Sequence, residues 1–142
     1  MNKIINILLV EDDQLDSMDI KRSLDKLNIL YRMSVARNGE EALQVLKGEH
    51  QNSFEKLPDV ILIDINMPRM NGLELLSVIR ATDEWKDLKC FMITTSDEKV
   101  DKDKSSELGV SGYIVKPFKA NSSSLDSFNL MIDLMNMKAG TF

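Results

Sequence analysis

The sequence predicts an α/β fold in which helices cover both faces of a five-stranded parallel sheet. Short, β-branched apolar segments alternate along the chain with longer segments whose apolar residues recur at helical spacing. Several short segments are apolar at consecutive positions, which is typical of parallel strands buried on both faces. Five repeats of strand then helix imply right-handed crossovers, and 142 residues suit one domain.

The strands are expected at five apolar segments: Ile4–Val10, Tyr31–Ala36, Asp59–Ile63, Cys90–Thr94 and Gly112–Val115. Helical spacing marks four clear helices, with apolar residues at positions 15–27, 42–46, 73–79 and 125–135. Asn38 and Asn71 are each followed by Gly and acidic residues, which indicates capped helix starts. Asp97–Leu108 has few apolar residues and predicts a weak, exposed helix that ends at Gly109. The polar stretch Gly48–Leu57 is expected to form a surface loop, and His50 within it is expected to have no functional role.

Composition narrows the possible functions. A formal net charge of -5 and the lack of any Lys/Arg cluster argue against direct binding of nucleic acid. No apolar run approaches the roughly 20 residues needed to span a bilayer, so we expect no membrane insertion and a cytoplasmic protein. The single cysteine, Cys90, lies in an apolar stretch and is expected to be a core residue in a reducing compartment.

Polar residues stand at the end of four predicted strands: Glu11-Asp12-Asp13, Asp64, Thr94-Thr95-Ser96 and Lys116-Pro117. Ligands of open α/β sheets bind outside the carboxyl ends of the strands, so these residues are expected to meet there. Crowded carboxylates repel one another unless a cation neutralises them, and oxygen ligands in this number suit Mg²⁺. A metal ion and a lysine around one carboxylate could hold an incoming phosphoryl group.

Plainer interpretations exist for each of these residues. The run of three acids could simply stabilise a helix N-terminus, and Asp64 could cap the turn that follows its strand. Thr94 could be a strand residue with a satisfied hydroxyl, and Lys116 a solvated surface charge. Only the combination of all four strand ends favours a single site.

Four fragments, ILLVEDD, VILIDINMPRMNG, MITTSD and GYIVKPF, carry a resemblance that covers nearly the whole chain. In this order and spacing they resemble the receiver domains of two-component response regulators, which have a flavodoxin-like, doubly wound fold. The resemblance implies one receiver domain over residues 1–142 with no output domain. The chain is also similar to the single-domain receivers that partner bacterial phytochromes and other sensor kinases.

The resemblance also implies the site. Asp64 matches the phosphoacceptor, and the magnesium ligands would come from Asp12, Asp64 and the backbone carbonyl of Asn66, with Glu11 holding metal-bound water. Such a protein is a signalling phosphoacceptor rather than an enzyme, with only self-phosphorylation and self-dephosphorylation chemistry. A sensor histidine kinase or a phosphotransfer protein would donate the phosphoryl group, and phosphorylation would switch a surface that binds a downstream protein.

Further roles follow from the same resemblance. Thr94 and Lys116 would contact the phosphoryl group, and a cis peptide bond before Pro117 would direct Lys116 toward it. Tyr113 matches the aromatic residue that changes rotamer together with Thr94.

Two more sets of residues are singled out by their position in the sequence. Three residues border the path of attacking water and would set the phosphate lifetime: Asn66, Thr95 and Ser96. A second apolar stripe on the last helix, namely Leu130, Leu134 and Met137, could belong to a wide buried face. It could instead belong to an interface, including a homodimer through the last two helices and the fifth strand.

Two rival functions remain open. A haloacid-dehalogenase-type phosphatase also uses an Asp nucleophile after a strand, but it needs a second Asp where this chain has Asn66, which cannot transfer the proton. A receiver-like scaffold that is never phosphorylated would need none of these groups. The sequence does not identify the kinase, the signal, the downstream target, the phosphate lifetime or the oligomeric state.

Overall fold

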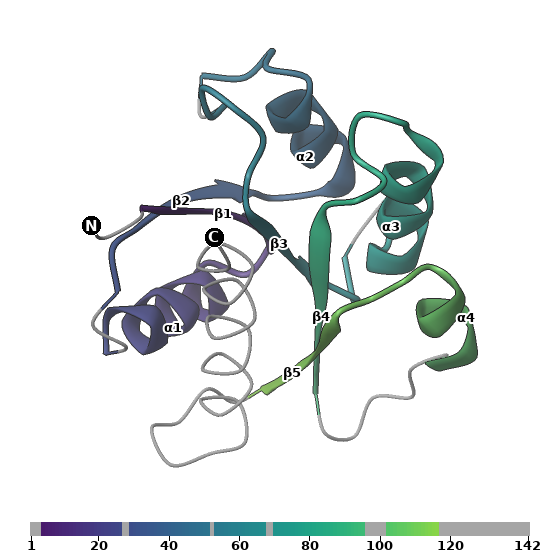
Figure 1. Cartoon of the computed structure of the whole chain (residues 1–142). Helices are drawn as coiled ribbons and strands as arrows, with labels where there is room; N and C mark the ends of the chain where they lie inside the picture. The colour runs from purple at the N-terminus through teal and green to yellow at the C-terminus, as the bar shows by residue number, and fades with distance from the viewer. Residues whose placement is uncertain (1–3, 27–28, 52, 68–69, 96–101, 117–142) are drawn as a thin grey trace, which may run out of the picture.

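The computed structural model describes residues 4–26, 29–51, 53–67, 70–95 and 102–116. Strands and helices alternate along the chain, as the sequence predicts (Figure 1). Their bounds are β1 Ile5–Val10, α1 Gln14–Asp25, β2 Tyr31–Ala36, α2 Gly39–Leu46, β3 Val60–Asp64, α3 Gly72–Ala81, β4 Lys89–Thr95, α4 Lys102–Glu107 and β5 Gly112–Lys116.

The five strands form one parallel sheet in the order β2-β1-β3-β4-β5. This order confirms the doubly wound fold. The chain moves outward from β1 to β2 and then returns past β1 to β3, so the winding direction reverses between β1 and β3. Such a reversal leaves a crevice at the carboxyl ends of the two strands, because their following loops run to opposite faces of the sheet.

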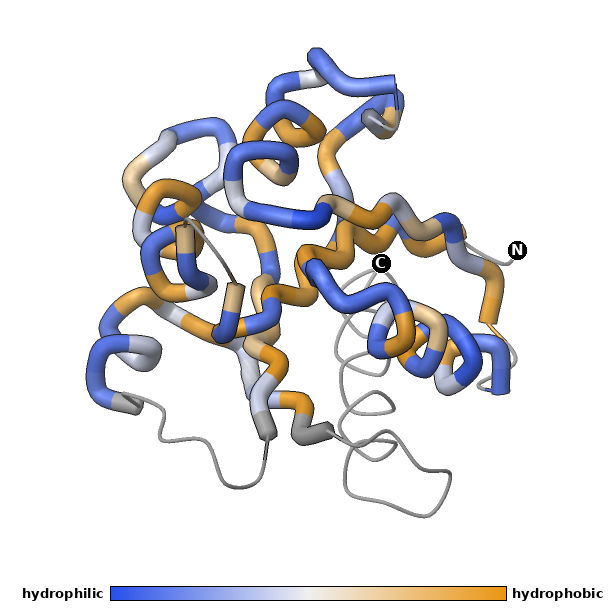
Figure 2. The backbone as a smooth tube through the Cα atoms, turned by 180° about the vertical axis from the view of Figure 1, so that it is seen from behind, coloured by the Kyte–Doolittle hydropathy of each residue, from blue (hydrophilic) through white to orange (hydrophobic). Residues whose placement is uncertain are grey.

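The two faces of the sheet carry separate apolar cores. On one face, β1 and β3 side chains pack against Ile20 and Leu24 of α1. On the other face, alternate residues of the same strands pack against α2 and α3, through residues such as Val45 and Leu76. Figure 2 shows the apolar colour concentrated along the central strands. All five residues of β3 are buried, which accounts for its unbroken apolar sequence up to Asp64.

Helix starts follow the predicted capping residues. The Asn38 side chain accepts a hydrogen bond from the Glu41 N–H at 2.8 Å and begins α2. Asn71 and Glu74 form a reciprocal capping box at the start of α3, with bonds of 2.9 and 3.3 Å. Both sequence interpretations are therefore confirmed.

The fourth helix is described only as the six residues Lys102–Glu107, of which Ser105 is buried. Its exposed character and its end at Gly109, which has a φ of +68°, agree with the sequence interpretation. The expected start of this helix at Asp97 lies outside the described residues. So do Ser96, Pro117, the last helix and its three apolar positions Leu130, Leu134 and Met137.

Two core residues determine how the protein responds to thiol reagents and what its intrinsic fluorescence reports. Cys90 is fully buried in β4, and burial raises the pKa of its thiol to about 11, so the thiol is protonated and unreactive near neutral pH. Trp85, the single tryptophan of the chain, is 5% exposed in the connection between α3 and β4.

Among the helices in the described ranges, none has the length and apolar character that crossing a membrane requires.

Arg80, in the last turn of α3, ties together two connections at the amino end of the sheet. Its guanidinium donates to the Leu108 and Gly109 carbonyls at 2.6 and 3.0 Å. It also donates to the Lys86 and Leu88 carbonyls at 2.9 and 2.7 Å. One side chain thus joins the end of α3 to the segments that lead into β4 and β5.

Arg80→Met should lower the free energy of unfolding by about 2–4 kcal/mol, because four carbonyls lose a charged donor. Arg80→Lys should lose less, since an ammonium can still donate to some of the four. Urea denaturation followed by Trp85 fluorescence measures both. If the free energy of unfolding is unchanged in Arg80→Met, the hydrogen bonds from Arg80 to the four carbonyls do not stabilise the fold.

Candidate phosphoryl-transfer site

The acidic residues after β1 and β3 are brought together by the pairing of the two strands. Val10 pairs with Ile63, so the next residues, Glu11 and Asp64, lie side by side at the edge of the sheet. Carboxylate oxygens of Glu11, Asp12 and Asp64 all lie within 4.8 Å of one another. The sequence prediction that acids from two separate strands converge is therefore confirmed.

The three carboxylates differ in their exposure. Glu11 is 1% exposed and Asp64 5% exposed, whereas Asp12 is exposed to solvent. The Asn66 N–H donates to Asp64 Oδ1 at 3.1 Å, which fixes the orientation of that carboxylate. Buried like charges at this spacing are costly, and a hard divalent cation with oxygen ligands relieves the cost. The donor set therefore fits a divalent cation.

Asp13 has a different role from its two acidic neighbours. Its side chain accepts hydrogen bonds from the Leu15 and Asp16 N–H groups at 2.9 and 3.1 Å and caps α1. Its own N–H donates to Glu11 Oε2 at 3.3 Å. The helix-capping interpretation of the acidic run is thus correct for Asp13, while Glu11 and Asp12 join Asp64.

The neighbouring strands bring the other predicted groups to the same edge. Asp64 pairs with Ile93, so Thr94 is the next residue along β4, and its side chain is 7% exposed. Thr95 of β4 pairs with Lys116 of β5, which places the backbone of Lys116 at the same end of the sheet. The side chains of Thr95 and Lys116 are not among those described.

Tyr113 lies on β5 opposite Met92 and is half-buried against the core that α2 and α3 share. Because side chains alternate between faces, Thr94 projects from the same face as Met92, and Tyr113 projects from that face too. The two proposed switch residues are therefore diagonal neighbours on adjacent strands.

Sequence reasoning missed the contact that Gly72 makes at this site. A Cβ on Gly72 would lie 2.6 Å from the Asp64 carbonyl oxygen and 2.9 Å from Ile65 Cα. Both are backbone atoms that cannot move away easily, so the first turn of α3 packs directly on the residue bearing the carboxylate. The Asn71-Gly72 pair predicts a helix start, which the structure confirms, but that signal does not reveal this contact.

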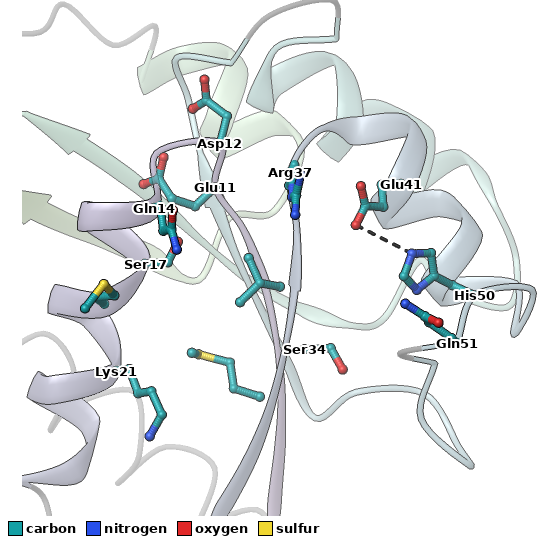
Figure 3. Close-up of a pocket in the computed structure, with 13 residues that line it drawn as sticks. Glu11, Asp12, Gln14, Ser17, Lys21, Ser34, Arg37, Glu41, His50 and Gln51 are labelled. Carbon is teal, nitrogen blue, oxygen red and sulfur yellow. Dashed lines mark ion pairs between the residues drawn. The ribbon is translucent and has the colours of Figure 1, made fainter.

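His50 lies closer to other charged groups than the sequence suggests. Its imidazole Nε2 is 3.5 Å from Glu41 Oε1 of α2, and both side chains are largely buried. Figure 3 shows this pair on the opposite side of β2 from α1. The expectation that His50 has no functional role is not tested by this contact.

With this geometry established, comparison with known proteins identifies the family. Residues 7–124 match the family model of the response regulator receiver domain, so the chain belongs to this family of two-component signalling proteins. Receiver domains accept phosphoryl groups in phosphorelays, partner with sensor histidine kinases and are signalling proteins rather than classical enzymes. No finding supports a phosphatase or a scaffold.

The chain is 37% identical over 120 residues to chemotaxis protein CheY-3 of Vibrio cholerae, which covers 84% of this chain and 86% of CheY-3. The bacteriophytochrome response regulator RtBRR superposes with a TM-score of 0.77 and 34% identity, over 92% of this chain and 77% of RtBRR. The Mn²⁺-bound form of Rcp1, a response regulator of Synechocystis, superposes with a TM-score of 0.73 and 28% identity, over 97% of this chain and 96% of Rcp1.

The family also includes segments of longer proteins. A stretch of 112 residues is 34% identical to the sensor histidine kinase CheAY of Helicobacter pylori, but it spans only 13% of CheAY.

Asp12→Asn should weaken divalent-cation binding by about ten- to a hundred-fold, because it removes a charged ligand. Asp13→Asn is the matched control: asparagine caps helices as well as aspartate does, so affinity should stay within about two-fold. Titration with Mn²⁺, following the free ion by electron paramagnetic resonance, measures both. Equal losses in the two variants would argue for general surface charge rather than a built site.

Gly72→Ala should lower cation affinity and destabilise the fold by about 1–3 kcal/mol, because the added methyl group displaces the backbone at Asp64. Gly48→Ala is the control, since Gly48 has a φ of +77° and open space around its Cβ. Its backbone strain should cost about 1 kcal/mol while cation affinity stays unchanged. If both alanine variants bind the cation like the parent protein, the α3 contact does not shape the site.

Proposed function

We propose that Asp64 is the residue that accepts the phosphoryl group, with Mg²⁺ bound by Asp12, Asp64 and the backbone carbonyl of Asn66. Glu11 is proposed to hold water molecules of the metal. The observation that carries this proposal is the approach of three carboxylates from two neighbouring strands to within 4.8 Å. The existence of a Mn²⁺-bound form of the related protein Rcp1 supports binding of a divalent metal by this chain.

The proposed reaction is in-line displacement at phosphorus. An oxygen of the Asp64 carboxylate forms the new bond to phosphorus as the bond to the phosphohistidine nitrogen breaks, and the imidazole leaves with that electron pair. The Asn66 N–H holds the Asp64 carboxylate in position for the attack. Bound Mg²⁺ supplies neutralising charge for the phosphoryl oxygens.

The remaining groups of the site act on the product. Thr94, at the end of β4, donates its hydroxyl to a phosphoryl oxygen, and Lys116, at the end of β5, supplies a second positive charge. The product is an acyl phosphate, which water can hydrolyse. Asn66, Thr95 and Ser96 border that water and set the lifetime.

Reorientation of Thr94 toward the phosphoryl group is proposed to couple to Tyr113. The two side chains project from the same face of adjacent strands, so movement of the smaller one opens space for the larger. The change at Tyr113 would alter the surface near β5 and present it to a downstream protein. An interface through Leu130, Leu134 and Met137, including a homodimer, remains a prediction from the sequence.

The proposed phosphoryl donor is the phosphohistidine of a sensor histidine kinase or of a phosphotransfer protein, in the cytoplasm. Similarity to a bacteriophytochrome response regulator supports a kinase of the phytochrome class.

Incubation with acetyl phosphate and Mg²⁺, followed by intact-mass measurement, tests the acceptor. The parent protein should gain one phosphoryl mass, and Asp64→Asn should gain none. Thr94→Ala should slow the gain by about a hundred-fold, whereas Thr94→Ser, which keeps the hydroxyl, should retain most of the rate.

Three outcomes would contradict the assignment. Steady release of phosphate without a lasting adduct would indicate a phosphatase. The absence of both adduct and turnover would indicate a scaffold. An adduct that persists in Asp64→Asn would place the acceptor elsewhere.

A further inference from the structure

The outer side of β2 offers backbone groups that the rest of the sheet does not use. β2 is the terminal strand, and hydrogen bonds to β1 fix which of its residues face inward. The Ile5 N–H donates to the Leu30 carbonyl and the Glu11 N–H to the Ala36 carbonyl, both at 2.9 Å. In a parallel pair only every second residue directs its backbone groups toward the neighbour, so the even-numbered residues from 30 to 36 face β1.

Met33 and Val35 therefore direct their N–H and C=O groups away from the sheet. Within the residues that the structure describes, these groups make no hydrogen bond. Two residues spaced i and i+2 with outward N–H and C=O groups are the pattern that an added strand pairs with.

The open edge forms the floor of a groove rather than an exposed ridge (Figure 3). α1 forms one wall, which includes Met18, and the Glu41–His50 pair and Gln51 form the other. The groove has a volume of about 850 Å³, within the range of sites that take ligands.

The chemistry of the groove differs between its two sides. The side chains of Met33 and Val35 lie on the α1 side of the strand, where they are half-buried against the core, and Met18 is 43% exposed there. The opposite wall is polar. A strand bound in the groove would thus direct every second side chain toward Met18, Met33 and Val35, and the other side chains toward the polar wall.

Charge limits the occupant further. Arg32 and Arg37 flank the central residues of β2, both are exposed, and neither forms an ion pair with any described residue. They stand five residues apart, or roughly 17 Å along an extended chain. Three acids line the groove: Glu41 faces His50, while Glu11 and Asp12 belong to the cation site at the Arg37 end. Carboxylates near both ends of an extended segment would complement the two arginines.

We propose that the β2 groove binds an extended segment of a partner protein, which adds to the sheet as a strand beside β2. The segment has apolar residues at alternate positions and an acidic residue near each end. A second copy of this chain fits less well, because antiparallel pairing of two β2 strands about Ser34 would place Arg32 of one copy opposite Ala36 of the other, next to that copy's Arg37. The recessed position of the edge opposes it too.

A library of capped eight-residue peptides tests the proposal, each with alternating valine and variable positions between aspartates at positions 2 and 7, which are five residues apart as Arg32 and Arg37 are. Binding is measured by fluorescence anisotropy on the full-length protein. Selected peptides should bind, and N-methylation of the amides that face β2 should weaken binding at least ten-fold, because it removes donors without changing the side chains. Asp64→Asn should bind as the parent does, so the result is independent of phosphoryl transfer.

Variants of the protein locate the binding site. Val35→Pro removes an outward N–H without taking a hydrogen bond from β1, and it should also weaken binding at least ten-fold. Val35→Thr, which is also β-branched and keeps the N–H although it adds a hydroxyl, is the matched control and should bind within about two-fold. Arg32→Gln with Arg37→Gln should weaken binding of these peptides but not of peptides with serine in place of the two aspartates.

The proposal is overturned if no member of the library binds better than its N-methylated counterpart. It is also overturned if Val35→Pro, shown to be folded by circular dichroism, binds the peptides as tightly as Val35→Thr. Self-association in sedimentation that Val35→Pro abolishes would show that a second copy, rather than a partner segment, occupies the edge.

Discussion

The repulsion among three carboxylates at one edge of the sheet is the constraint on which the site depends. The pairing of Val10 with Ile63 forces Glu11 and Asp64 together, and both are nearly inaccessible to solvent. The strands cannot relieve the repulsion by sliding, because a shift of one residue would turn every core side chain to the wrong face. The hydrophobic core thus holds an arrangement of charge that would otherwise separate, and a cation is the natural complement to it.

Much of this could be predicted from the sequence, and the exceptions have physical reasons. Consecutive apolar residues identified buried strands, and Asn38 and Asn71 marked helix starts, because these signals are local. The sequence could not show that Asp13 caps α1 while Asp12 joins the carboxylate cluster, because the direction of the helix axis decides which of two adjacent aspartates caps it. Arg80 gave no signal at all, because its four partners are backbone carbonyls, which any sequence supplies.

The loop after β1 is shared by two features of the surface. Glu11 and Asp12 contribute to the cation site, and the same two residues close one end of the groove beside β2. The cation site and the groove are therefore contiguous along this one loop. The opposite edge of the sheet, at β5, carries Tyr113, so the two margins of one sheet present surfaces of different chemistry.

The burial of Trp85 determines what intrinsic emission can report. The indole lies in the connection that precedes β4, at the amino end of the sheet, while Asp64 pairs with Ile93 four residues into that strand. The part of β4 from Lys89 to Ile93 alone extends over about 13 Å, and packed core lies between the indole and Asp64 as well. Trp85 fluorescence should consequently change on global unfolding but hardly change when the charge at the carboxyl edge of the sheet changes. Optical kinetics of signalling in this protein would need a fluorophore introduced near that edge.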